Sequence, residues 1–438
     1  MTTKIIALTG ALSAVLLAPS TRAADYTLHT WKKIQLSDQF WSEGANIGDF
    51  NKDGKMDVVS GPYWWAGPDY KTRHEFYPAA KFWKLGKLSQ IQVPGFEGAL
   101  GHNNTYSDNF FVFTHDFNKD GWDDILIYGF PGQDASWYEN PKNEGGTSPW
   151  KRHKVFDVVD NESPQWGDIT GDKLPEIVSN SRGTFGYASP EWNDPTKPWT
   201  WHAVTPKGGW QRFTHGMGFG DVSGDGKPDL LEAKAWWEQT PGGEWTKHAA
   251  NFGDGGAQMY AYDVNGDGLN DVITSIQAHG HGLSWFEQKK DGAKISFTEH
   301  RFVGKTAKDN KYGVVFSQLH AVDLVDIDGD GLKDIVTGKR FWAHGAHGDA
   351  DPNGPAVVYW FKLVRQADGS VDWIPHLIDN DSGVGTQVVA ADANGDGLPE
   401  VIVGNKKGTF IHIHGTKKVS KEEWEKAQPK PLPQTAAN

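Results

Sequence analysis

The chain has 438 residues, a formal net charge of −13 and no cysteine. This length allows a sizeable buried core, and the absence of cysteine excludes disulfides, thiol catalysis and thiolate zinc sites. The acidic balance argues against a nucleic-acid partner. Glycine (52) and tryptophan (21) are abundant, which suits a turn-rich all-β chain with many aromatic side chains to place.

The first 23 residues have the layout of a secretory signal peptide. Lys4 gives a positive start, residues 5–17 are apolar, and Thr21 and Ala23 put small residues at the −3 and −1 positions. Neither this stretch nor any later segment is long and apolar enough to span a membrane. We expect residues 1–23 to be removed and the mature protein to be exported to the periplasm or the extracellular medium. The alternative is an N-terminal membrane anchor.

A nine-residue acidic pattern then occurs seven times, and we number these segments as the first to seventh acidic loops. Subtraction of their start positions gives spacings of 42 to 67 residues; the loops start at Asp49, Asp116, Asp168, Asp221, Asp263, Asp326 and Asp392. Short apolar runs precede and follow each loop, and many units continue with an aromatic strand and a strand that places a histidine three residues after an aromatic residue. Four strands in each of seven units predict an all-β, seven-bladed β-propeller over residues 24–416.

The two ends of the chain fit this closure. The segment HTWKKIQL, from His29, is typical of an outer strand, whereas the last unit has no outer strand of its own. We expect the N-terminal strand to complete the last blade and remove an open sheet edge. Residues 417–438 are predicted to form a short helix, with Ser420 and Glu423 as a capping box, and a disordered tail.

The acidic loops have the spacing of a calcium-binding loop. Oxygen-bearing side chains stand at positions 1, 3, 5 and 9, which gives a hard cation such as Ca²⁺ the wrapped oxygen set that it prefers. The predicted ligands are Asp49, Asn51, Asp53, Asp57, Asp116, Asn118, Asp120, Asp124, Asp168, Thr170, Asp172, Glu176, Asp221, Ser223, Asp225, Asp229, Asp263, Asn265, Asp267, Asp271, Asp326, Asp328, Asp330, Asp334, Asp392, Asn394, Asp396 and Glu400. Up to seven structural Ca²⁺ ions would then stabilise the fold; the alternative is a set of solvated acidic turns.

The third acidic loop departs from the pattern. It has Thr170 at position 3, Lys173 in place of the glycine and Glu176 at position 9. We expect this calcium site to be the weakest, or empty.

These seven loops and their flanking strands resemble the FG-GAP/VCBS repeat class, which is familiar from integrin α-subunit propellers and many secreted bacterial proteins. The similarity covers nearly the whole mature chain. It implies a calcium-stabilised propeller and no particular activity.

Unusual polar and aromatic residues gather in the segments that enter the inner strands or leave the second strands, opposite the acidic loops. In a propeller these segments meet at one channel mouth, the usual place for a ligand site. We predict a divalent metal such as Zn²⁺ or Mn²⁺ on His215, His281 and His320. The predicted catalytic residues are His279, Lys339 and Arg340, and the predicted substrate-binding residues are Arg182, Trp210, Arg212, Gln318, Trp342 and Lys406.

A second, weaker resemblance concerns these mouth segments. The segments SQLHAVDLVDIDGDG and LSWFEQ, together with the Trp-x-x-His strands, are similar to the propeller of fungal aldos-2-ulose dehydratase. That resemblance implies metal-assisted elimination on a keto-sugar or glycoside. Two hypotheses stay open: a carbohydrate lyase or dehydratase, and a non-catalytic propeller that binds glycan or protein. We expect a monomer in either case.

Overall fold

The computed structural model describes residues 26–433 except 80–82, 87–88, 93–104 and 143–148. The predicted signal peptide, residues 1–23, lies outside the described residues, as do residues 434–438 of the predicted tail. Within the described part, no helix has the length and apolar character needed to cross a membrane.

The described chain divides into two compact units, of which the small one comprises residues 26–28 and 416–428. It contains helix α1 (Lys421–Ala427), which begins at the predicted capping box: the Ser420 hydroxyl accepts from the Glu423 N–H, and the Glu423 side chain accepts from the Ser420 N–H. Tyr26 packs against Trp424 with ring centroids 5.5 Å apart. The predicted domain boundary after residue 416 stays a prediction, and all that follows concerns the large unit, residues 29–415 and 429–433.

The large unit is built from antiparallel groups of four strands, as the alternation of apolar runs and acidic loops predicts. Three groups are separate sheets: β2 (Asn46–Gly48), β3 (Asp57–Ser60), β4 (Tyr63–Trp65) and β5 (Arg73–Glu75); β24 (Val322–Val325), β25 (Asp334–Gly338), β26 (Val358–Arg365) and β27 (Val371–Asp379); and β28 (Val388–Ala391), β29 (Glu400–Asn405) and β30 (Gly408–Val419) with β1 (Tyr26–Ser37). The pairing of β1 with β30 confirms that the N-terminal strand completes the last group.

Four further groups are fused in pairs. One sheet holds β9 (Phe111–His115), β10 (Asp124–Tyr128), β11 (Gln133–Glu139), β12 (Lys151–Gly167), β13 (Glu176–Ser181), β14 (Thr184–Ser189) and β15 (Thr200–Ala203), where the first part of the long β12 pairs with β11 and its last part with β13. The other holds β16 (Met217–Gly220), β17 (Asp229–Glu232), β18 (Ala235–Gln239), β19 (Trp245–Ala249), β20 (Gln258–Tyr262), β21 (Asp271–Ser275), β22 (Leu283–Asp291) and β23 (Lys294–Val303), joined by the parallel pairing of β16 with β20.

Smaller elements complete the description. A three-stranded sheet contains β6 (Trp83–Gly86), β7 (Ser89–Gln92) and β8 (Thr105–Tyr106), and η1 (Ala307–Asp309) is a single 3₁₀ turn. Each acidic loop joins the first strand of its group to the second.

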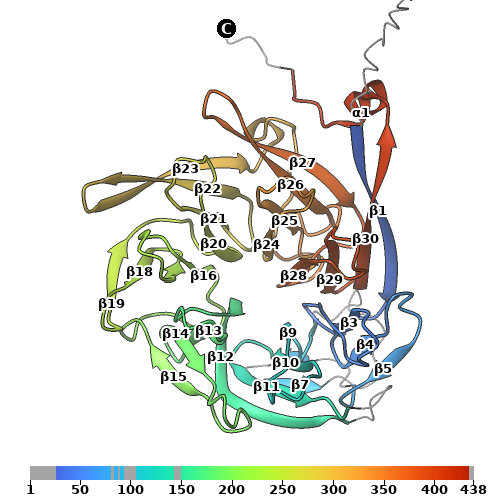
Figure 1. The fold of residues 1–438 in the computed structure, drawn as a ribbon, viewed down its shortest axis with the longest axis vertical. Coiled ribbons are helices and arrows are strands. Elements are labelled where there is room, and N and C mark those ends of the chain that lie inside the picture. The colour runs from blue at the N-terminus through green and yellow to red at the C-terminus, as the bar shows by residue number, and fades with distance from the viewer. Residues whose placement is uncertain (1–25, 80–82, 87–88, 93–104, 143–148, 434–438) are drawn as a thin grey trace, which may run out of the picture. The chain divides into compact units, whose positions relative to one another are not determined.

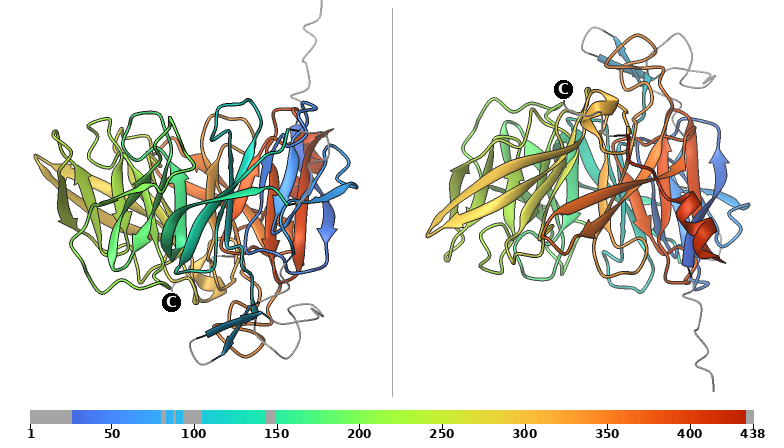
Figure 2. Two further views of the ribbon diagram at one scale, coloured as in Figure 1. Left: turned by 90° about the horizontal axis from the view of Figure 1, so that it is seen from below. Right: turned by 90° about the horizontal axis from the view of Figure 1, so that it is seen from above.

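Seven hydrophobic clusters among the described residues connect each group to the next. The closing cluster packs Val58 and Trp65 of the first group against Ala393, Ile402 and Ile411 of the last. The large unit is therefore closed on itself by apolar packing, which is the main source of folding free energy. Figure 1 shows its groups in chain order around a common centre, and Figure 2 shows their strands side by side in the views at right angles.

The recurring strand histidines have structural contacts. His153, His248 and His300 each stack on a tryptophan of the neighbouring strand, with centroids 4.3, 4.1 and 4.4 Å apart. Their Nε2 atoms lie 2.7–2.8 Å from glutamate oxygens of the same strand pair. These contacts account for the histidine at this position without a ligand.

Candidate functional site

The acidic loops are held by their own carboxylates. In the fifth loop, Asp263 accepts N–H bonds from Gly266 (2.7 Å) and Gly268 (3.1 Å). Asp271, at position 9, is buried and accepts from the backbone N–H groups of Val264 (2.9 Å) and Gln288 (2.7 Å). Position 9 thus fastens the loop to the third strand of its group. The third loop has the same form, because Asp168 accepts from the Lys173 N–H and Glu176 from the Ile169 N–H.

Burial raises the pKa of the position-9 carboxyl in every loop, and nearby carboxylates add to the shift. The values are about 7 for Asp57, about 8 for Asp124, about 7 for Glu176, about 6 for Asp229, about 6 for Asp271, about 7 for Asp334 and about 6 for Glu400. A carboxylate in such a place is costly to keep charged unless a cation lies beside it.

The sixth loop has a carboxylate, Asp328, where the other loops have Asn, Ser or Thr at position 3. Among the described residues it is the acidic loop in which three carboxylates, those of Asp326, Asp328 and Asp334, bring oxygens within 4.8 Å of one another. Lys362 contacts Asp328 and lies 2.7 Å from an Asp330 oxygen. The loop oxygens therefore fit a hard cation, and the Lys362 ammonium neutralises part of their charge.

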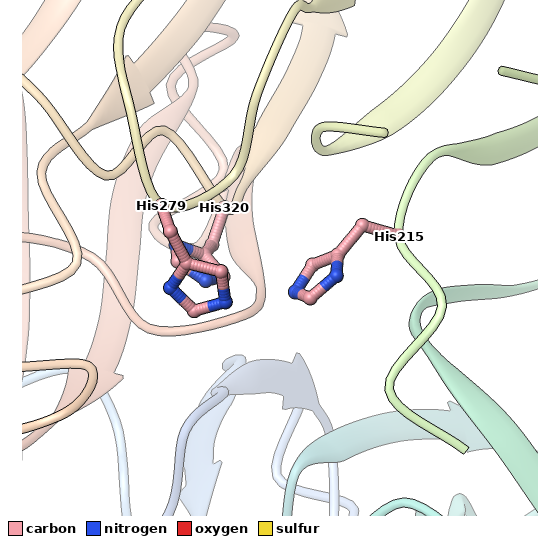
Figure 3. Close-up of side chains that lie close together, drawn as sticks. All are labelled: His215, His279 and His320. Atoms are coloured by element: carbon pink, nitrogen blue, oxygen red, sulfur yellow. The ribbon is translucent and has the colours of Figure 1, made fainter. Parts of the chain in front are cut away.

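Three histidines from distant segments meet on the other side of the strand groups, and we call them the histidine centre. His215 precedes β16, His279 follows β21 and His320 precedes β24. Their ring centroids are 4.5 to 5.4 Å apart, and one nitrogen of each lies within 4.8 Å of the others. Figure 3 shows the His215 and His279 rings pointing toward one another, with His320 beside His279.

Each histidine of this centre has a buried nitrogen without a hydrogen-bond partner: Nε2 of His215, Nδ1 of His279 and Nε2 of His320. Nδ1 of His320 lies 3.3 Å from the Gln318 carbonyl oxygen, so it carries the proton and leaves a lone pair on Nε2. Nδ1 of His279 lies 3.2 Å from Oδ1 of Asp349, without hydrogen-bond geometry. Burial lowers the pKa of both His279 and His320, which favours the neutral, ligand-competent imidazole.

A buried salt bridge lies beside this centre, and we call it the ion bridge. Arg340 donates to both carboxylate oxygens of Glu43 (3.0 and 3.1 Å) and to Glu162 (2.7 Å), and all three side chains are at most 8% exposed. Oε2 of Glu162 is also 3.6 Å from Nε2 of His215. Although burial opposes it, His215 and Arg340 hold the pKa of Glu162 well below its usual range.

A second group shares His279. Asp349 accepts from Nδ1 of His344 at 2.9 Å, and His279, His344 and Asp349 bring ligand atoms within 4.8 Å of one another. The His279 and His344 rings are 4.5 Å apart. Since Asp349 engages Nδ1 of the half-exposed His344, the other ring nitrogen is directed away from the carboxylate and is suited to accept a proton.

In the structure, His279 rather than His281 lies with His215 and His320, while the predicted metal set itself stays a prediction. His281 is half-buried and lies outside the histidine groups of the described chain. The predicted catalytic Arg340 is fully engaged in the ion bridge. Nζ of the predicted base Lys339 donates to Ser317 Oγ (2.6 Å) and the Asp351 carbonyl (2.5 Å), so this ammonium holds a loop.

Three predicted substrate-binding residues lie on the third and fourth strand groups, away from the histidine centre. Arg182 is exposed and 3.6 Å from Asp157. Trp210 packs against Phe185, with centroids 4.9 Å apart, and exposed Arg212 lies over the Phe213 ring. These residues follow β13 or precede β16, as predicted, but Arg182 and Arg212 are exposed and Trp210 packs against a hydrophobic cluster.

The other three predicted binding residues support the segment 340–357. The buried Gln318 side chain accepts from the Ala343 N–H and donates to the Ala350 carbonyl. Lys406 Nζ donates to the Trp342 carbonyl at 2.7 Å, and the Trp342 indole donates to Asn353 at 2.9 Å. Of these, Trp342 is half-exposed and stacks with Phe341, centroids 5.4 Å apart.

Glu43, Glu162, Asp349 and His344 were not predicted as site residues. Glu43 precedes β2, and Glu162 lies in β12 where its register with β13 shifts. Both residues therefore stand where the chain enters an inner strand, as His215 and His320 do. The topological rule that selected the histidines would therefore have found both glutamates. His344 and Asp349 belong to the segment after β25, and only their mutual contact distinguishes them from other exposed residues there.

Comparison with known proteins identifies the repeat. Residues 116–179 and 263–337 match the family model described as FG-GAP-like repeat. No curated protein matches the chain. Similar solved structures include an Agrocybe aegerita lectin described as recognising non-reducing terminal N-acetylglucosamine (16% identity, 89% of this chain and 86% of the lectin, TM-score 0.44). BBS1N, solved in complex with ARL6DN, is 9% identical over 94% of this chain and 100% of its own, with a TM-score of 0.46.

Proposed function

We propose, from the premise that this chain carries FG-GAP-like repeats, that it is an exported, calcium-stabilised, seven-bladed β-propeller whose histidine centre holds one further divalent metal ion. The activity that we propose is elimination on a keto-sugar or glycoside, that is, a lyase or dehydratase reaction. The observation that carries the proposal is the convergence of three imidazoles from three different strand groups, each of which brings one ring nitrogen within 4.8 Å of the others.

Closure and calcium binding have separate support. Seven inter-group clusters, the last joining the final group to the first, support a closed seven-bladed ring among the described residues. The oxygen-bearing side chains at positions 1, 3, 5 and 9 of each loop support cations at the acidic loops. Calcium bound to the folded loops would contribute to folding stability in a chain that has no disulfides.

The histidine centre suits Zn²⁺ or Mn²⁺ better than Ca²⁺, because neutral imidazole nitrogens are the donors. His215, His279 and His320 would hold the ion, and two carboxylates stand beside them: Glu162, 3.6 Å from His215, and Asp349, 3.2 Å from His279. The Gln318 carbonyl fixes the tautomer of His320, and Arg340 fixes the position of Glu162. Such supporting contacts are what a preorganised metal site requires.

The proposed chemistry needs an electrophile, a base and a surface for the sugar ring. The metal ion would polarise the substrate carbonyl. His344, oriented by Asp349, would take the proton from the adjacent carbon, the new C=C bond would form, and the β-oxygen would leave as water or alcohol after it gains a proton from solvent. The half-exposed pair Phe341 and Trp342 offers an aromatic face for a sugar ring.

Two measurements on the purified protein test the reaction. The first is its elemental content, and the second is the ultraviolet absorbance of an α,β-unsaturated product formed from keto-sugars or uronate oligosaccharides. We expect product from the metal-loaded protein and its loss in His344→Ala, which keeps the metal. His347→Ala, an exposed neighbour in the same segment, is the matched control. Metal-loaded protein that forms no unsaturated product and binds these sugars unchanged would favour the non-catalytic binding propeller instead.

A further inference from the structure

A cavity lies in the large unit along its inner strands. It is nearer to the acidic loops than the histidine centre is. This cavity has a volume of about 260 Å³ and is lined by residues of the inner strand of every strand group, Asn46, Phe111, Phe113, Gln165, Trp166, Phe219, Gln258, Tyr260, Val322, Asp323, Gln387 and Val389 among them. We call it the channel cavity. Each of these strands ends at an acidic loop.

Hydrogen bonds connect the ion bridge to the wall of the channel cavity. Glu43, held by Arg340, accepts the Thr386 N–H through its carbonyl. The Thr386 carbonyl in turn accepts from the Gln258 side chain, which lines the channel cavity. These hydrogen bonds connect the ion bridge, which lies beside the histidine centre, to the wall of the channel cavity. None of the three histidines of the centre lines this cavity.

The channel cavity has polar groups with unused capacity. Nε2 of Gln165 is buried and has no hydrogen-bond partner, and a buried donor left unpaired costs about 1–3 kcal/mol. Asp323 accepts the N–H groups of Leu324 and Ala390, one at each oxygen, and also interacts with the side chain of Tyr260, which lines the same cavity. Burial raises the pKa of this carboxyl, so it is suited to exchange hydrogen bonds with a neutral hydroxyl group.

Four half-buried aromatic side chains complete the wall: Phe113, Trp166, Phe219 and Tyr260. Aromatic faces with a few fixed amide and carboxyl groups are the surroundings in which a hydroxylated ring is held, since its C–H face packs and its hydroxyls bond. The cavity volume of about 260 Å³ admits one such ring.

We infer that the channel cavity is a second ligand site, which takes a single neutral monosaccharide ring, with Gln165 donating to a hydroxyl and Asp323 accepting from one. This site goes beyond the proposed reaction and does not depend on the metal ion. It would let the protein respond to a small sugar separately from the substrate at the histidine centre.

The test is saturation-transfer NMR and titration of the full mature chain with D-glucose, D-galactose, D-mannose and N-acetyl-D-glucosamine. At least one sugar is expected to bind, about tenfold more weakly in Gln165→Leu, which removes the donor. Val389→Phe, which fills the cavity, is a second variant that decides the result if Gln165→Leu fails to fold. His279→Ala is the matched control at the histidine centre and should bind the sugar normally.

Three results would overturn the inference. The first is the absence of saturation transfer to all four sugars in the wild-type protein, and the second is equal affinity in the wild-type and the cavity variants. The third is a sugar that binds normally to Val389→Phe but not to His279→Ala, which would place the ring at the histidine centre. Failure of the elimination reaction alone leaves the expected result of this experiment unchanged.

Discussion

The acidic loops and the histidine centre lie at opposite ends of the same inner strands, yet they are built on opposite principles. Each loop repeats one hydrogen-bond pattern, in which the position-9 carboxyl accepts from the backbone N–H at position 2 of the same loop. The histidine centre and the ion bridge use each residue once and join segments up to 297 positions apart. Each repeated loop contributes to stability through its own contacts. The unrepeated contacts instead bring charged and metal-ligating side chains together in one place.

Removal of one member of the ion bridge should cause the largest loss of unfolding free energy. Arg340→Leu leaves Glu43 and Glu162 buried without their partner, and removing one member of such a bridge costs about 3–5 kcal/mol of unfolding free energy. Arg182→Leu, which removes an exposed pair with Asp157, should cost less than about 1 kcal/mol. Urea unfolding measures both, and equal effects would contradict the assignment of the bridge.

Acid should destabilise a third region, the one in which β1 pairs with β30. Burial lowers the pKa of His376, His412 and His414 to about 4, with His29 and Lys362 beside His376 and Asp379 and Lys33 beside His412. A lowered pKa means that the unfolded chain binds protons first. The stability that these imidazoles contribute is therefore full above about pH 6.5 and falls as the pH drops toward 4, by roughly 1.4 kcal/mol per pH unit for each of them. The position-9 carboxyls, whose pKa values are raised, act in the opposite direction, so the imidazole effect is read from the difference between variants.

The measurement is the unfolding free energy as a function of pH for the wild type and for His414→Gln. Nε2 of His414 contacts Nδ1 of His29 at 2.9 Å, so the substitution removes one of the buried titrating groups and should flatten the fall. His347→Gln, at an exposed position, is the control. An identical pH slope in all three proteins would contradict this explanation.

Within one acidic loop, position 9 should matter more than position 5 for the fold itself. Asp271→Ala leaves the buried N–H groups of Val264 and Gln288 unpaired, which should cost about 2–3 kcal/mol in calcium-free buffer. Asp267→Ala, in the exposed part of the same loop, should cost under about 1 kcal/mol there. Both variants should lose part of the stabilisation that added calcium gives to the wild type, as measured by thermal melting.

The smallest effect is expected from the third loop. A chelator should lower the melting temperature of the wild type, because calcium that binds only the folded loops stabilises by mass action. Asp172→Asn should change this chelator effect less than Asp267→Asn does, since Thr170 and Lys173 weaken the third site. No chelator effect on the wild type would contradict the calcium assignment altogether.

The repeated half of the molecule was predictable because its rules are local. The acidic loops, the strands beside them and the closing N-terminal strand follow from periodicity and turn chemistry, which seven copies reinforce. The helix cap at Ser420 is local as well, and the structure confirms it. Here the sequence pattern and the packing agree in every group.

The unrepeated half could be predicted only as a region. That His215 and His320 enter one centre follows from topology, but the choice between His279 and His281 depends on the tight bend around Gly280 and Gly282, and Gly282 has φ +122°. Arg340 looked like a free charge because Glu43 stands 297 residues away in the chain. Long-range pairing of single residues leaves no period in the sequence from which it could be inferred.

The central claim is that the histidine centre binds a transition-metal ion, and His279 and His281 offer the most direct test of it. The measurement is the elemental content of wild-type, His279→Ala and His281→Ala proteins after equal exposure to Zn²⁺ and dialysis. We predict one zinc ion in the wild type and in His281→Ala, none in His279→Ala, and the same calcium content in all three. Equal zinc content in the two variants, or loss from His281→Ala alone, would contradict the account.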